Sequence, residues 1–344
     1  EERVTLRRLS GQPLQIQVKP GDAVARVVAR AQKILQAQVT LVHEGKLLHL
    51  DAPASELAGQ EVDLVVMPPS PRAVTGCEDG SIKYWDLEAF SCLGSLDGHR
   101  GAVWALAADL PSKLALSGSA DTSLMLWDLE RLECLRSFEG HSGAVCCVSA
   151  DFQRKWAVSG SDDGTLRLWS FNQRSELLTL RCHGTAWSMV ASCEDQAAVS
   201  GHEGGSVQVW NLAEGADASP HILEGRHHGL VQVVQADFQR GKAASGSDDG
   251  IYCIWDLSRM VCTYLVQGFN QQSVWSMDSS FDLSFAALSG SFDGSLHLWD
   301  VRGDEPTQSW RGLSVCTLAS DFSAKRAVSG TYDGRLLLWN LQDG

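Results

Sequence analysis

Apolar and polar residues alternate over short stretches through most of the chain after residue 71. Residues 165–169 (Thr-Leu-Arg-Leu-Trp) show the pattern, which predicts a strand with one buried face. An Asp-Gly pair just before them fits a tight hairpin turn that needs positive φ. In the same register, one apolar stretch ends in Ser-Gly before the turn, one follows the Trp (133–138) and one follows a Gly-His pair (144–148). The pattern predicts four short antiparallel strands per unit and no helix within the unit.

This unit recurs along the chain. The copies are TGCEDGSIKYWDLE (75–88), SGSADTSLMLWDLE (117–130), SGSDDGTLRLWSFN (159–172), SGHEGGSVQVWNLA (200–213), SGSDDGIYCIWDLS (245–258), SGSFDGSLHLWDVR (289–302) and SGTYDGRLLLWNLQ (329–342). Their tryptophans are spaced 42, 42, 41, 45, 44 and 40 residues apart. A period of this length predicts a propeller or a solenoid. Seven small sheets arranged radially would bury their faces on one another and protect their edges.

The Gly-His, Ser-Gly, Asp-Gly and Trp-Asp pairs at these offsets resemble the WD40 repeat family. The resemblance implies a mainly β protein with a seven-bladed β-propeller over residues 72–344, roughly four fifths of the chain. It also implies a structural tetrad of His, Ser, Asp and Trp in each blade. The matching residues are His99, Ser117, Asp121 and Trp127 in the second unit, His141, Ser159, Asp163 and Trp169 in the third, and His227, Ser245, Asp249 and Trp255 in the fifth.

Other units depart from the tetrad. The fourth unit keeps His183, Ser200 and Trp210 but has Gly204 in place of the Asp. The His position reads Phe269-Asn270 in the sixth unit and Arg311 in the seventh. The first unit begins at its Ser-Gly strand and the last ends after its Trp strand, so each is one strand short. Closure of the ring therefore requires strands from elsewhere.

The first seventy residues have a different pattern. Two alternating stretches predict a hairpin, Asp22 is a candidate N-cap for a helix with one apolar stripe, and two further strands end at residue 66. This ββαββ order resembles a ubiquitin-like β-grasp domain, small and α+β, over residues 1–68, with a Pro-rich linker at 69–71. The apolar recognition patch of that family falls on Leu9, Val42 and Val65. The patch either packs without a binding role or docks another protein. Because the last strand runs into Pro68-Pro69 rather than an Arg-Gly-Gly tail, conjugation is not expected.

Charge is distributed unevenly between these regions. The chain has 28 Lys and Arg against 42 Asp and Glu, a formal charge of −14, while residues 1–70 are neutral overall. The excess on residues 71–344 disfavours nucleic acid and anionic membranes as partners. No apolar run is long enough to span a membrane, so no membrane insertion is expected. The ten cysteines show no zinc-type spacing, which predicts a reducing intracellular compartment, cytoplasmic or nuclear, or an organelle if a targeting segment has been removed.

Candidate chemistry is sparse. His, Ser and Asp recur together as in a hydrolase triad, but their near-repetition in several units indicates a structural role. His227-His228 and His202-Glu203 have no third metal ligand nearby in the sequence, and no phosphate-binding loop is present. We expect no catalytic residue, metal or cofactor. A propeller hydrolase remains the less favoured alternative.

The resemblance also implies two sets of partner-binding positions on the upper propeller face, where the innermost strands begin. The first set holds Trp104, Trp187 and Trp275. The second set holds Glu78, Asp162, Glu203, Asp248, Phe292 and Tyr332. Indoles provide large contact area, and carboxylates with aromatic rings favour a basic or Arg-containing segment. The alternatives are that the indoles fill the channel wall and that the rim only serves solubility.

These observations predict a non-enzymatic protein-interaction scaffold, a subunit or assembly platform of a multiprotein complex. The main alternative is a ubiquitin-pathway adaptor, in which the propeller selects substrates and the ubiquitin-like domain docks to other components.

Overall fold

The computed structural model describes residues 2–8, 13–18, 39–43, 46–47, 61–66, 71–173, 176–223, 225–267, 273–281, 286–291, 294–300, 306–311, 315–322, 325–331 and 334–341. The chain divides into two compact units. The first consists of Glu1–Pro71 and Asp86–Ala89, and the second of Arg72–Trp85 and Phe90–Gly344.

The N-terminal unit contains one mixed sheet. Its strands are β1 (Glu2–Arg8), β2 (Pro13–Val18), β3 (Val39–His43), β4 (Lys46–Leu47) and β5 (Glu61–Val66), in the order β2-β1-β5-β3-β4. β1 is antiparallel to β2 and parallel to β5, and β5 is antiparallel to β3. The parallel pair joins the first and last strands of the unit, as a long crossover requires. The helix predicted after Asp22 lies outside the described residues, so the ubiquitin-like fold stays a prediction.

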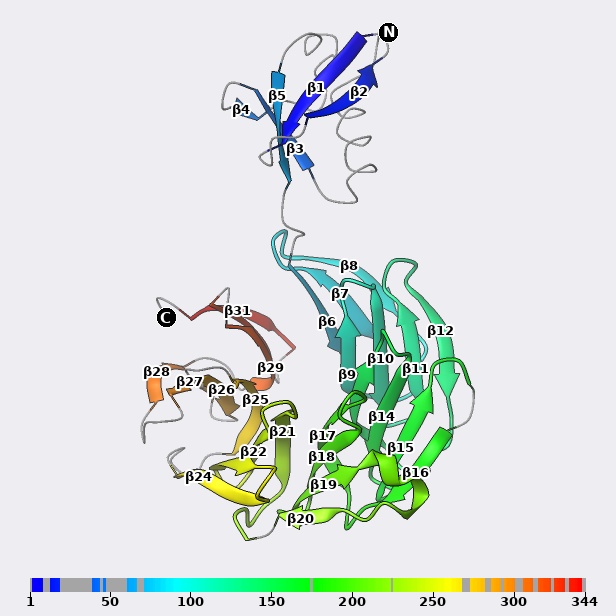
Figure 1. The fold of residues 1–344 in the computed structure, drawn as a ribbon, viewed down its shortest axis with the longest axis vertical. Helices are drawn as coiled ribbons and strands as arrows, with labels where there is room; N and C mark the ends of the chain where they lie inside the picture. Colours follow the sequence, from blue (N-terminus) through cyan, green and yellow to red (C-terminus); the bar gives the residue numbers. More distant parts are fainter. Residues whose placement is uncertain are drawn as a thin grey trace. The chain divides into compact units, whose positions relative to one another are not determined.

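The second unit is a β-propeller (Figure 1). Its first two sheets contain β6 (Arg72–Gly76), β7 (Ile82–Asp86) and β8 (Ser91–Leu96), then β9 (Val103–Asp109), β10 (Leu114–Ser119), β11 (Leu124–Asp128) and β12 (Glu133–Phe138). The next two contain β13 (Val145–Asp151), β14 (Trp156–Ser161), β15 (Thr165–Ser170) and β16 (Glu176–Arg181), then β17 (Ala186–Ser192), β18 (Ala197–His202), β19 (Val207–Asn211) and β20 (His221–Leu223), with the 3₁₀ helix η2 (Leu212–Asp217) before β20.

The last three sheets complete the described propeller. They contain β21 (Val231–Asp237), β22 (Lys242–Ser247), β23 (Ile251–Asp256) and β24 (Val261–Gln267), then β25 (Val274–Ser280), β26 (Ala286–Ser291), β27 (Ser295–Asp300) and β28 (Pro306–Arg311), and finally β29 (Val315–Asp321), β30 (Arg326–Thr331) and β31 (Leu336–Asn340).

The blade count differs from the seven expected. The innermost strands β9, β13, β17, β21, β25 and β29 pack one against the next, so six blades supply an inner strand among the described residues (Figure 1). The β6–β8 sheet has three strands and begins at the strand that comes second in every other blade. It has no inner strand because the residues before Arg72 belong to the N-terminal unit.

Apolar residues pack between neighbouring sheets. One such cluster joins Leu116 and Phe138 to Val145 and Trp169 of the next blade. Several glycines of the Ser-Gly pairs are part of this contact: a Cβ added at Gly118 would lie 2.5 Å from Val145 Cγ1. A Cβ added at Gly201 would likewise clash with Val231, and one added at Gly290 would clash with Val315. At these positions only glycine leaves space for the first residue of the next inner strand.

Candidate functional site

The predicted tetrad residues of the β9–β12 blade form a hydrogen-bonded chain. Trp127 Nε1 donates to Ser117 Oγ at 2.8 Å, and Ser117 Oγ lies 2.6 Å from His99 Nε2. His99 Nδ1 lies 2.9 Å from Asp121 Oδ2. The arrangement in which Ser117 donates to Nε2 and Nδ1–H donates to the carboxylate satisfies every member. The chain ties the loop before β9 to the strands β10 and β11 and to the turn between them.

The β13–β16 blade has the same geometry. Trp169 donates to Ser159 at 2.8 Å, Ser159 lies 2.7 Å from His141 Nε2, and His141 Nδ1 lies 2.8 Å from an oxygen of Asp163. Burial lowers the pKa of His141, against the opposing effect of Asp163. A buried neutral imidazole is therefore the form that the blade holds.

The β21–β24 blade has a longer distance between its histidine and its aspartate than the two blades above. Trp255 donates to Ser245 at 2.8 Å, and Ser245 lies 2.7 Å from His227 Nε2. His227 Nδ1 lies 3.7 Å from Asp249 Oδ1 and has no hydrogen-bond partner. Burial raises the pKa of Asp249, but the neighbouring His227 ring and hydrogen bonds from the backbone N–H groups of His228 and Ile251 together outweigh burial and lower the pKa to about 2.

The Ser-His-Asp order within these chains matches that of a hydrolase triad, yet the serines are inaccessible. Ser117, Ser159 and Ser245 are each 0% exposed and accept a hydrogen bond from a buried indole. A substrate carbonyl cannot reach an oxygen without exposed surface. These serines therefore hold strands together.

The β17–β20 blade corrects the assignment of His183. His202 takes its place, with Nε2 2.8 Å from Ser200 Oγ and Nδ1 3.3 Å from the carbonyl oxygen of Gly184, and Trp210 donates to Ser200 at 2.8 Å. His183 is exposed, and its backbone contacts the side chain of Gln208. The physical reason is Gly204, which supplies no carboxylate to hold His183. The sequence signal was the third residue of Ser-Gly-His, where four other units have Ser and two have Cys or Thr.

The tryptophans predicted to bind partners stand at β-bulges. The ladder between the first two strands skips one residue near the start of each inner strand, and that residue is Trp104 in β9, Trp187 in β17 and Trp275 in β25. A bulge residue is released from the ladder, so its side chain is re-aimed. The structure thus gives these three positions a shared geometry.

Trp104 and Trp187 lie close together. Their rings stack with centroids 6.2 Å apart and an interplanar angle of 21°, although the β13–β16 blade stands between their strands. Trp104 is 50% exposed, whereas Trp187 is half-buried and its indole N–H is buried without an acceptor. Trp275 is half-buried. The stacked pair, named the indole pair below, combines exposed apolar surface with an unsatisfied donor.

The predicted acidic rim residues are at the surface. Glu78, Asp162, Glu203 and Asp248 are all exposed. Asp162 accepts a hydrogen bond from Thr185 Oγ1 at 3.0 Å, which fixes one carboxylate near the start of β17.

Other predicted positions cannot be placed. Phe292, Tyr332 and Leu9 lie outside the described residues. Val42 and Val65 lie on the neighbouring strands β3 and β5, and the described structure extends to their backbone only.

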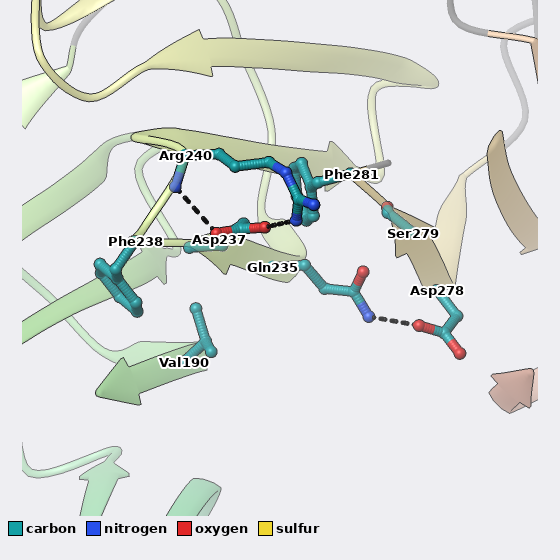
Figure 2. Close-up of a pocket in the computed structure, with 9 residues that line it drawn as sticks. Val190, Gln235, Asp237, Phe238, Arg240, Asp278, Ser279 and Phe281 are labelled. Carbon is teal, nitrogen blue, oxygen red and sulfur yellow. Dashed lines mark hydrogen bonds and ion pairs between the residues drawn. The ribbon is translucent and has the colours of Figure 1, made fainter. Parts of the chain in front are cut away.

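The sequence did not indicate a cavity at the other end of the inner strands. It has a volume of about 510 Å³ and is lined by residues of β17, β21 and β25 and of the segments that follow β21 and β25 (Figure 2). Gln235 Nε2 donates to Met277 O and Asp278 Oδ1, and Asp278 Oδ2 accepts from Ser320 Oγ at 2.8 Å. This network joins three successive inner strands. Gln235 Oε1 is buried and has no partner.

Within the described ranges, no cluster of three or more His, Cys, Asp or Glu residues could hold a metal ion. No helix in the same ranges is long and apolar enough to cross a membrane.

Comparison with known families gives one match. The family described as WD domain, G-beta repeat matches residues 54–86, 90–128, 132–170 and 260–300. The chain therefore contains WD40 repeats. A search of curated proteins found no match.

Proposed function

We propose that this protein is a non-enzymatic interaction scaffold that binds a basic or Arg-containing segment of a partner at the upper propeller face. The observation that carries the proposal is the indole pair, a half-exposed Trp104 stacked on Trp187. Large exposed rings lose apolar contact with water when a partner covers them, which makes them typical interface anchors. WD40 propellers in general are consistent with such a role.

The exposed ring of the indole pair and the predicted acidic rim residues select the partner chemistry. A guanidinium over the exposed face of Trp104 gains a cation–π attraction of about 0.5–2 kcal/mol. The exposed carboxylates Glu78, Asp162, Glu203 and Asp248 steer a cation towards this rim. Each feature favours a basic peptide over an acidic one.

A peptide titration tests this site. The probe is a nine-residue Gly-Ser peptide with one central Arg, and its citrulline counterpart keeps the shape without the charge. We expect Trp104→Ala to weaken Arg-peptide binding about tenfold or more, which corresponds to about 1.4 kcal/mol. Leu135→Ala is the matched control, because Leu135 is exposed on the outer strand β12. Equal binding of the two peptides, or full binding by Trp104→Ala, contradicts the proposal.

A second candidate function is a ubiquitin-pathway adaptor. The supporting observation is the sheet order β2-β1-β5-β3-β4 with a parallel β1–β5 pair, which agrees with a ubiquitin-like domain. Val42 and Val65 lie on adjacent strands of that sheet. The adaptor version predicts that Val42→Glu abolishes capture of a partner from native extract, while Arg-peptide binding at the propeller persists. Capture that survives Val42→Glu excludes this docking face.

Domain limits and location belong to the same proposal. The division near Pro71 supports a domain at 1–68, a linker at 69–71 and a propeller at 72–344. All ten cysteines are free thiols, which supports a reducing intracellular compartment, cytoplasmic or nuclear.

A further inference from the structure

The inner edge of β6 carries no partner strand among the strands that the structure describes. Among the described strands, β6 pairs only with β7, whereas β10, β14, β18, β22, β26 and β30 each carry an inner strand on the equivalent edge. An unpaired edge leaves a row of N–H and C=O groups available to another strand. The β6–β8 sheet thus presents a strand-docking surface whose occupant has to be found.

We infer that the segment that fits this edge is Glu61–Val66, the strand β5 of the same chain. Spacing is the first argument. In the blades that begin with β9, β13, β17, β21 and β29, the first inner-strand residue lies 14 residues before the Ser of Ser-Gly. Thr75 holds that Ser position in the β6–β8 sheet, and the residue 14 positions earlier is Glu61. β5 therefore starts where an inner strand should.

The connection to the next strand also has the right length. Four residues separate β9 from β10 and β21 from β22, and five separate β25 from β26. Five residues separate β5 from β6. Such short links join antiparallel neighbours.

The family match gives an independent argument. The first WD40 match covers residues 54–86, and this range contains β5, β6 and β7. By the pattern of the family, residues 61–76 form the first two strands of one repeat. In the present structure, however, β5 lies between β1 and β3, with Val65 opposite Thr40 and Leu6 opposite Val62. The same strand fits two sheets.

The two pairings exclude each other. A strand has two edges, and both edges of β5 are occupied by β1 and β3. Pairing with β6 therefore requires β5 to leave at least one of these neighbours. Glu61 weakens the propeller pairing, because other inner strands begin with Val or Ala that is buried at 0% exposure, as at Val145, Ala186 and Val231. A charge at that position biases the strand towards the N-terminal sheet.

Paired cysteines distinguish the two pairings in the full chain. If β5 and β6 follow the register of β9 and β10, in which Ala107 faces Leu116, then Val65 faces Val74. Facing Cα atoms in antiparallel strands are about 4.5–5.5 Å apart, within reach of a disulfide. The double variant Val65→Cys, Val74→Cys reports the propeller pairing. The double variant Val65→Cys, Thr40→Cys reports the N-terminal sheet.

We expect peptide mapping under non-reducing conditions to find the 65–74 disulfide, at a yield that Glu61→Val raises at least threefold. The control is Val65→Cys, Ala73→Cys, which is one residue out of register and should not form a bond. A 65–74 yield no greater than this control overturns the inference. A 65–74 bond found only between two chains also overturns it, because the occupant would then be a second copy.

Hydrogen exchange provides a measurement without new cysteines. Glu61→Val should slow exchange of the amides in β6 about tenfold or more and speed exchange in β1 and β3. Unchanged exchange in β6 contradicts the inference even if the cysteine variants fail to fold.

Discussion

The β13–β16 and β17–β20 blades solve one packing problem with different residues. Both bury a tryptophan whose indole N–H donates to a serine, and both place a histidine Nε2 on that serine. In the first blade the histidine comes from the preceding loop and rests on the carboxylate of Asp163. In the second blade it comes from the blade itself and rests on the carbonyl of Gly184. The Ser–Trp pair is therefore the shared requirement, while the source of the histidine and its anchor can change.

The largest expected difference between the two blades is their response to acid. Burial lowers the pKa of His202 from 6.5 to about 4. Below pH 6.5 the imidazole of His202 binds a proton in the unfolded chain but not in the folded blade. The contribution of His202 to the free energy of unfolding is therefore fully present above pH 6.5 and is lost as the pH falls towards 4. The loss amounts to about 3 kcal/mol. Urea unfolding at pH 7 and pH 4.5 should show that the free energy of unfolding falls less in His202→Gln than in the unmodified protein.

Acid has a different effect on the carboxylate anchors. Burial raises the pKa of Asp121, but hydrogen bonds from Ser123, Arg100 and His99 outweigh it and lower the pKa to about 2. Stability from this group is present above its ordinary value of 3.8 and is lost only as the pH falls towards 2. The free energy of unfolding should fall less in His202→Gln than in the unmodified protein between pH 6.5 and pH 4. An equal fall in both proteins would contradict the assignment of His202.

A glycine substitution where the β9–β12 blade meets the β13–β16 blade should have a smaller effect. Gly118→Ala places a methyl 2.5 Å from Val145 Cγ1, and overpacking of this kind costs about 1–3 kcal/mol. Gly204→Ala is the matched control, because a Cβ there meets nothing within 4 Å. We expect Gly204→Ala to change the free energy of unfolding by less than about 0.5 kcal/mol. Equal losses in the two variants would show that the contact between blades is not the cause.

The smallest effect concerns the two histidines of the β17–β20 blade. His202→Ala leaves Ser200 without its acceptor and should cost about 1–2 kcal/mol. His183→Ala removes an exposed ring and should cost less than about 0.5 kcal/mol. Thermal unfolding of both variants checks the order, and a larger loss for His183→Ala would restore the original assignment.

Local repetition explains what the sequence could predict. The strands, the hairpin turns and the tetrads around Ser117, Ser159 and Ser245 follow from period-two patterns and fixed offsets within one unit. Fixed offsets also caused the error at His183: the offset selects this histidine, but Gly204 provides no carboxylate to hold it. The predicted count of seven blades was wrong for a related reason. The motif of the first unit identifies its second and third strands but does not show where an inner strand would pair.

Contacts between blades could not be predicted from these patterns. The stacking of Trp104 on Trp187 joins blades that are not sequence neighbours, and it depends on how far each bulge turns its side chain inward. The network of Gln235, Asp278 and Ser320 likewise needs three inner strands to be placed before it can be recognised. Both depend on the radial arrangement of sheets, which periodicity along one strand does not define.

The glycine of Ser-Gly has a consequence for how such a chain can change length. Inside the ring, the glycine of one blade leaves a space that receives the first inner-strand residue of the next blade, as Gly118 receives Val145 and Gly201 receives Val231. Both halves of the contact are thus encoded in one internal copy, so tandem duplication of one such unit creates both halves of a new interface at once. Blades are interchangeable parts in this sense, and the number of repeats can drift by whole units while the packing between them is preserved.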